Sequence, residues 1–90
     1  MPSDGIFTAT TQWAPVQING EDIANGTFSV VNLERHRVDF LKAESVPAQS
    51  DQGSSFMNQR KDSNKYTLEG AERLYCKSGS MNAPLGVVPA

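Results

Sequence analysis

The residues of this chain that could take part in catalysis are few, and their spacing does not group them into a site. His36 is the only histidine among 90 residues, and it lies between Arg35 and Arg37. Two adjacent positive charges disfavour the protonated imidazole, which makes His36 a poor general base. Asp39 and one of the serines would have to complete a Ser-His-Asp arrangement, and no spacing in the sequence indicates one. We therefore expect a protein that is not an enzyme.

Metal and cofactor sites have no better support. Zinc sites need several cysteine or histidine ligands, and the chain has one of each. Four carboxylates in expected loops could meet a hard cation, but we expect them to be solvated: Glu21, Asp22, Asp51 and Asp62. The Asn-Gly pairs at 19–20 and 25–26 are turn signals without a following helix, so they do not predict a phosphate loop. The sequence therefore predicts no metal and no cofactor.

The remaining reactive or aromatic side chains point to packing and recognition. Cys76 alternates with apolar residues, so it is expected to behave as a small buried hydrophobe. Trp13 could close the core or anchor a partner, since tryptophan is favoured both in cores and at interface hot spots. Tyr75, flanked by Arg73 and Lys77, could belong to a recognition surface, or to an ordinary solvated sheet face with one aromatic residue.

The element that carries most of these residues is the segment 66–90. Arg73–Lys77 alternates polar and apolar residues, so Leu74 and Cys76 are expected on the dry face and Tyr75 on the wet face. A second apolar run, Leu85–Val88, follows a short loop that contains glycine. These two runs predict a closing β-hairpin.

Composition limits the fold to one small domain with a thin core. Leu, Ile, Val and Phe make up 19 of the 90 residues, and the formal net charge is −2. Seven glycines and five prolines favour turn-rich β structure. A core this thin suggests support from neighbouring subunits. The near-neutral charge gives no basic footprint for nucleic acid, and we expect no signal peptide and no membrane span.

The rest of the chain completes an all-β prediction. Residues 1–9 are expected to form an N-terminal arm with Ile6 and Phe7 as its apolar anchor, ahead of a β-sandwich domain over residues 10–90. Pro15 lies within an expected strand, Thr10–Ile18, that should be an edge strand or carry a bulge, because proline cannot donate to a ladder. Further strands are expected at Thr27–Asn32, Arg37–Glu44, Ser54–Asn58 and Lys65–Leu68, with loops at Ser45–Gly53 and Gln59–Lys65. A helix is the alternative for 31–43, but its β-formers and lack of caps favour a strand. About seven short strands at this spacing predict an antiparallel sandwich or a jelly-roll-like barrel.

Several short motifs in this order resemble a known group of proteins. They are T-x-W-x-x-V at 11–16, F-S-V-V-N at 28–32, A-E-S-V-P-A-Q-S-D-Q-G at 43–53, the Y-x-L-x-G-x-E-R-L-Y-x-K-S strand at 66–78, and a small-residue and valine strand at 83–88. Together they resemble the small all-β virion proteins of tailed bacteriophages, which decorate capsids or build tail and fibre parts. Those proteins have a longer glycine-rich segment before the strand that corresponds to residues 66–78, where this chain has QRKDSNK.

The resemblance implies a structural role and no catalytic residues. We expect a capsid decoration, or cement, protein that forms a homotrimer, contacts the major capsid protein or another virion protein, and is located in the virion after assembly in the host cytoplasm. The alternative is a tail or fibre component, or a module that binds a host-surface glycan or protein through Trp13, Tyr75 or Ser45–Gly53. The candidate interface residues are Ile6, Phe7, Trp13, Pro15, Arg73, Tyr75 and Lys77.

Overall fold

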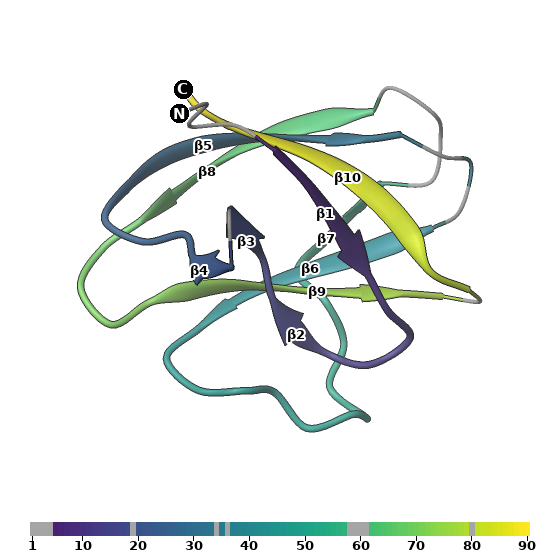
Figure 1. Cartoon of the computed structure of the whole chain (residues 1–90). Helices are drawn as coiled ribbons and strands as arrows, with labels where there is room; N and C mark the ends of the chain where they lie inside the picture. The colour runs from purple at the N-terminus through teal and green to yellow at the C-terminus, as the bar shows by residue number, and fades with distance from the viewer. Residues whose placement is uncertain (1–4, 19, 34, 36, 58–61, 80) are drawn as a thin grey trace.

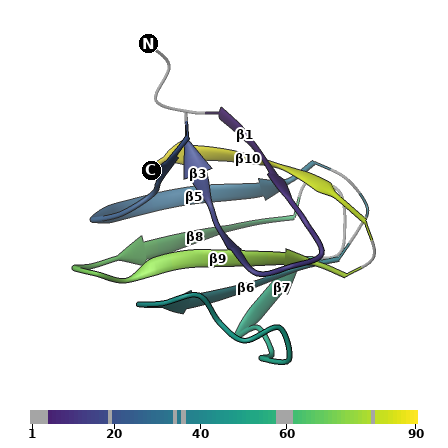
Figure 2. The same cartoon turned by 60° about the horizontal axis from the view of Figure 1, so that its bottom comes forward.

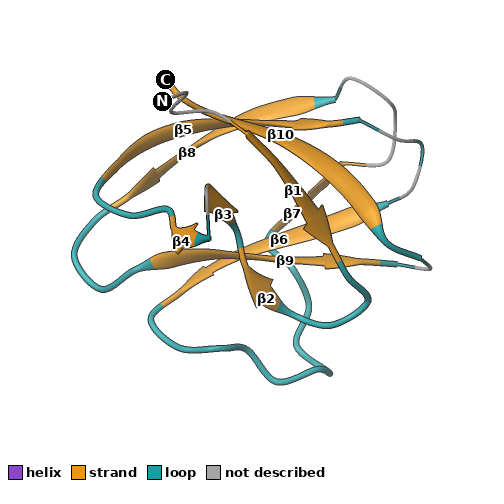
Figure 3. Cartoon of the chain, viewed as in Figure 1, coloured by secondary structure: helices purple, strands orange, loops and turns teal. Residues whose placement is uncertain are grey.

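The chain folds as an antiparallel β-sandwich, as the sequence predicts. The computed structural model describes residues 5–18, 20–33, 35, 37–57, 62–79 and 81–90, and every regular element in these ranges is a strand (Figure 3). His36 and the first four residues of the expected arm lie outside the described residues. No helix in the described ranges is long and apolar enough to cross a membrane.

Two four-stranded sheets face each other, and a short ribbon lies beside them (Figure 1). The first sheet has the order β1 (Gly5–Ala9), β10 (Ala83–Pro89), β5 (Gly26–Asn32) and β8 (Ser63–Leu68). The second sheet has the order β2 (Ala14–Pro15), β9 (Arg73–Ser78), β6 (Val38–Ala43) and β7 (Ser55–Met57). The ribbon pairs β3 (Gln17–Ile18) with β4 (Glu21–Asp22). Every pairing between the described strands is antiparallel.

The core forms because alternate residues of each strand face the opposite sheet. Val30 and Leu85 of the first sheet and Phe40 and Leu74 of the second are all fully buried in one cluster. Phe40 also meets Tyr66 of the opposite sheet with 5.4 Å between ring centroids, so aromatic contact joins the two layers.

The expected closing hairpin is wrong. β9 and β10 belong to different sheets, so residues 79–82 carry the chain from one layer to the other. Each strand buries one face, and placing the two in opposite layers turns both apolar faces into the same core. β9 then pairs with β2 and β6, and β10 pairs with β1 and β5. The alternation of Leu74 and Cys76 toward the core is confirmed, because both side chains are fully buried.

Two segments near the N-terminus differ from the expectation. Gly5–Ala9, expected within an arm, is β1, and it lies along β10 at one edge of the first sheet (Figure 2). Ala9 is fully buried and Phe7 packs against the core, so this segment belongs to the sandwich. The long strand expected over Thr10–Ile18 is divided into β2 and β3. Pro15 lies on β2 at the edge of the second sheet, where its missing N–H is tolerated.

Candidate interaction surfaces

Trp13 fastens a long loop, residues 44–54, onto the outer face of the second sheet. Its side chain is only 4% exposed, although it lies outside the core cluster between the sheets. The indole Nε1–H donates to the carbonyl oxygen of Asp51 at 3.2 Å, and the backbone N–H donates to Gln49 Oε1 at 3.3 Å. Trp13 is therefore a structural anchor of this loop.

Tyr75 was expected on a solvated face, and the structure corrects this: the residue is 5% exposed. It alternates with Leu74 and Cys76, so it lies on the outer face of β9, and it is also absent from the core cluster. Pro47 of the 44–54 loop is buried as well. Lys77, next along the same face, donates from Nζ to the carbonyl oxygen of Gln49 and lies 6.0 Å from the Trp13 ring centroid. The loop thus covers the part of the second sheet where we expected a recognition surface.

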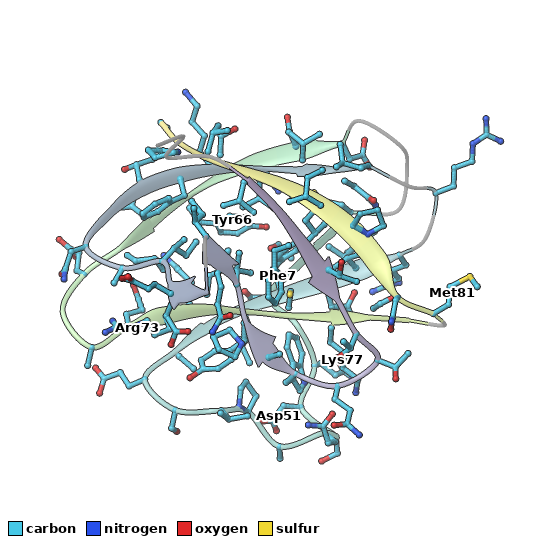
Figure 4. All side chains as sticks on the ribbon, in the orientation of Figure 1. Phe7, Asp51, Tyr66, Arg73, Lys77 and Met81 are labelled. Atoms are coloured by element: carbon cyan, nitrogen blue, oxygen red, sulfur yellow. The ribbon has the colours of Figure 1, made fainter. Side chains whose placement is uncertain are left out.

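The far end of the same loop is held by backbone contacts. Ser54 donates its N–H to the carbonyl oxygen of Phe40 at 2.9 Å. Gly53 lies so close to β6 that a Cβ built on it would be 2.9 Å from Asp39 Cβ and 3.0 Å from the Phe40 carbonyl oxygen. The segment that Trp13 binds is itself a turn closed by Asp51, with the Ala48 N–H donating to Asp51 Oδ2 at 3.0 Å. In Figure 4 Asp51 lies on this loop, below Lys77.

The other predicted interface residues are divided between places. Pro15 is half-buried and paired with Tyr75, so it lies near Trp13 and Lys77 at the edge of the second sheet. Arg73, at the start of β9, donates from Nη1 to the carbonyl oxygens of Gly70 and Glu72, both at 2.9 Å, and thereby closes a turn far from Lys77 (Figure 4). Phe7 points inward.

The potentially reactive groups that the structure describes are engaged in the fold. Burial raises the pKa of the Cys76 thiol from 9.0 to about 12, so the thiol is neutral and unreactive at ordinary pH. Asp39 forms an ion pair with Arg37, with 2.8 Å between Oδ1 and Nε. Among the described residues no group of three His, Cys, Asp or Glu side chains is close enough to hold a metal ion.

The outer face of the first sheet is an apolar surface of which the sequence analysis named only Ile6. Ile6 is 72% exposed there and Val88 is 37% exposed. Register places Ile6 beside Gly86 and Gly86 beside Val31, and Leu33 packs over Gly86, 3.7 Å from a Cβ built on that glycine. We call this surface the apolar strip; its residues are Ile6, Val31, Leu33, Pro84, Gly86 and Val88. The sequence of β10 holds a pattern that predicts this surface. Ala83, Leu85 and Val87 face the core, and Pro84, Gly86 and Val88 alternate with them on the outer face.

The apolar strip is uncharged across three strands. The outward positions of β1, β10 and β5 carry only apolar residues, glycine, serine and threonine. On the outer face of the fourth strand, β8, the first charged side chain is Lys65, which lies opposite Ser29 of β5. This face differs from the second sheet, where Arg73, Asp39 and Lys77 face outward.

Comparison with known proteins gave no relative. No protein-family model matches the chain, and no curated protein or solved structure is similar enough to count as a match.

Proposed function

We propose that this protein is a non-enzymatic structural component of a bacteriophage virion, of the kind that decorates and stabilises the capsid. The observation that carries the proposal is the apolar strip, an uncharged and partly exposed surface of the first sheet. Exposed apolar patches bordered by polar residues are typical of protein–protein contact sites. The phage assignment itself depends on the motif resemblance.

The strip suits contact with a flat, uncharged surface of the major capsid protein or another virion protein. All of its residues except Leu33 lie on paired strands, so little backbone freedom is lost on binding. One such contact is weak, but copies linked in a symmetric array bind with the combined strength of many contacts.

The alternative of a host-surface binding module has less support from the geometry. Glycan binding through Trp13 or Tyr75 would need an exposed aromatic face, and both side chains are buried. A tail or fibre component remains within the proposed structural class.

The proposal is tested on virions purified from the phage that encodes the chain. Mass spectrometry should find the chain in the particles, and added protein should bind particles that lack it. Val88→Lys should reduce this binding at least about tenfold, because a lysine in the strip must be desolvated on docking. Val46→Lys is the matched control, since Val46 is 60% exposed but lies on the 44–54 loop. Absence of the chain from virions, or equal binding by both variants, would refute the proposal.

A further inference from the structure

Of the four edge strands in the two described sheets, β1 alone is longer than three residues and carries neither a proline nor a lysine. The neighbouring β3 comes within 8 Å of β1 but forms no ladder with it. β2 has two residues and contains Pro15, and β7 has three residues. β8 carries Lys65 on its outer face, and its Thr67 carbonyl oxygen accepts a hydrogen bond from Lys42 Nζ at 3.2 Å. Short strands, proline and lysine are the devices that natural proteins use to block sheet edges. β1 has five residues, Gly-Ile-Phe-Thr-Ala, with no charge and no proline.

Hydrogen bonds at the two ends of β10 show which groups of β1 point away from the sheet. Ala90 donates its N–H to the carbonyl oxygen of Thr27 at 2.9 Å, and Leu33 donates to the carbonyl oxygen of Pro84 at 3.2 Å. Both bonds point toward β5. Consecutive residues of a strand direct their N–H and C=O groups to alternate sides, so Leu85 and Val87, between these two positions, direct theirs toward β1.

The register of β1 then follows. Leu85 is opposite Phe7 and Val87 is opposite Gly5, so Gly5, Phe7 and Ala9 use their backbone groups to bond β10. The N–H and C=O groups of Ile6 and Thr8 point outward. The described strands pair β1 with β10 alone.

We propose that β1 pairs antiparallel with β1 of a second copy of this chain, around a two-fold axis that passes beside Phe7. In this register Ile6 is opposite Thr8 of the partner subunit, and Thr8 is opposite Ile6 of the partner subunit. Each pair exchanges two hydrogen bonds, so all four outward groups on each strand find partners. A shift by one residue would place the strip of one copy against the core side of the other.

A second copy is the occupant that the observations favour. The outward groups of β1 complement those of an identical strand, as a two-fold interface requires. β1 carries no charged side chain that would repel the same side chain on the partner strand. The paired sheets also join the two apolar strips into one continuous face, with Ile6 of both copies near its centre. An isologous pair gives an even number of subunits, in place of the trimer expected from the sequence.

This inference deepens the proposed structural role by naming a partner, and its test is independent of particle binding. The mass of the purified chain is measured by sedimentation from about 1 μM to about 1 mM, a range that covers weak dimers. We expect a shift toward twice the 9.8 kDa of one chain as concentration rises. Thr8→Pro removes an outward donor and no bond to β10, and it should weaken the dimer about tenfold to hundredfold, since each copy loses a donor. Lys65→Pro is the matched control on the opposite edge of the same sheet, because Lys65 also points its N–H outward, and it should leave dimerisation unchanged.

Amide hydrogen exchange in the unmodified protein gives a readout that does not depend on any variant folding. The Ile6 and Thr8 amides should be protected at high concentration and exchange quickly when diluted, while the Phe7 amide stays protected throughout. A monomer at every concentration, or an oligomer in which the Ile6 and Thr8 amides exchange freely, would overturn the inference. A monomer that still binds virions would overturn this inference alone, and a dimer that is absent from virions would overturn only the proposed function.

Discussion

Gly53 is the position where the smallest substitution should have the clearest effect on the loop of residues 44–54. A Cβ at Gly53 would lie 2.9 Å from Asp39 Cβ, 3.0 Å from the Phe40 carbonyl oxygen and 3.2 Å from the Phe40 nitrogen. Two of these atoms belong to the backbone of β6, which is held between two neighbouring strands. In Gly53→Ala the strand or the loop must therefore shift.

Overpacking of this kind costs about 1–3 kcal/mol. For a domain of this size each kcal/mol lowers the melting temperature by about 4–8 °C. Gly79→Ala is the matched control, because its Cβ would meet Arg37 at an ordinary 3.6 Å and Gly79 keeps its N–H bond to the Arg37 carbonyl oxygen. That control should be neutral or should stabilise by about 0.4–1 kcal/mol, since alanine restricts the unfolded chain. Gly53→Ala is therefore expected to destabilise the protein, and Gly79→Ala is not.

The assay is urea unfolding followed by both circular dichroism and fluorescence of the single tryptophan. Circular dichroism reports the sheets, and Trp13 reports the loop that covers it. We expect the Gly53→Ala midpoint to fall in both signals. A Gly53→Ala protein as stable as Gly79→Ala would show that the loop does not press on β6 as described.

Two further predictions concern buried side chains. Burial raises the pKa of Cys76 from 9.0 to about 12, so as pH rises the thiol ionises first in the unfolded chain. The contribution of the neutral buried thiol to stability is therefore complete below pH 9 and is lost between pH 9 and about 12. Over that window the free energy of unfolding should fall more steeply in the parent than in Cys76→Ala, by up to about 1.4 kcal/mol per pH unit. Parallel curves of unfolding free energy against pH for the two proteins would contradict this. Trp13→Phe keeps an aromatic ring but removes the pyrrole half of the indole and its donor to Asp51, so it should cost about 1–3 kcal/mol and speed proteolysis within residues 44–54. Cleavage at the parental rate would show that the indole does not hold the loop.

The sequence predicted the strands whose pattern is local. Val38 and Phe40 alternate with less buried neighbours in β6. In β9 the sequence itself alternates, with Leu74 and Cys76 between the more polar residues Arg73, Tyr75 and Lys77. Such alternation is visible without knowledge of the partner strand. The edge position of Pro15 was equally predictable, because the constraint belongs to the residue itself.

Features that depend on contacts between residues far apart in the chain could not be predicted from the sequence. The sequence pattern of β9 and β10 fits either a hairpin or a crossing between layers, since both arrangements bury one face of each strand. Tyr75 is buried although it lies on the outer face of β9, and no alternation within β9 could reveal that burial. The open edge of β1 became visible only when the other edges and the direction of its backbone groups were known.

The position of β10 has a consequence for how the protein is made. It is the last strand along the chain, yet it lies between β1 and β5 in the first sheet. While the chain is being synthesised, the earliest strand therefore has no neighbour to pair with until residues 83–89 have left the ribosome. The first sheet is therefore completed only after translation has passed this point, because until then β5 can pair with β8 alone and β1 has no ladder partner among the described strands.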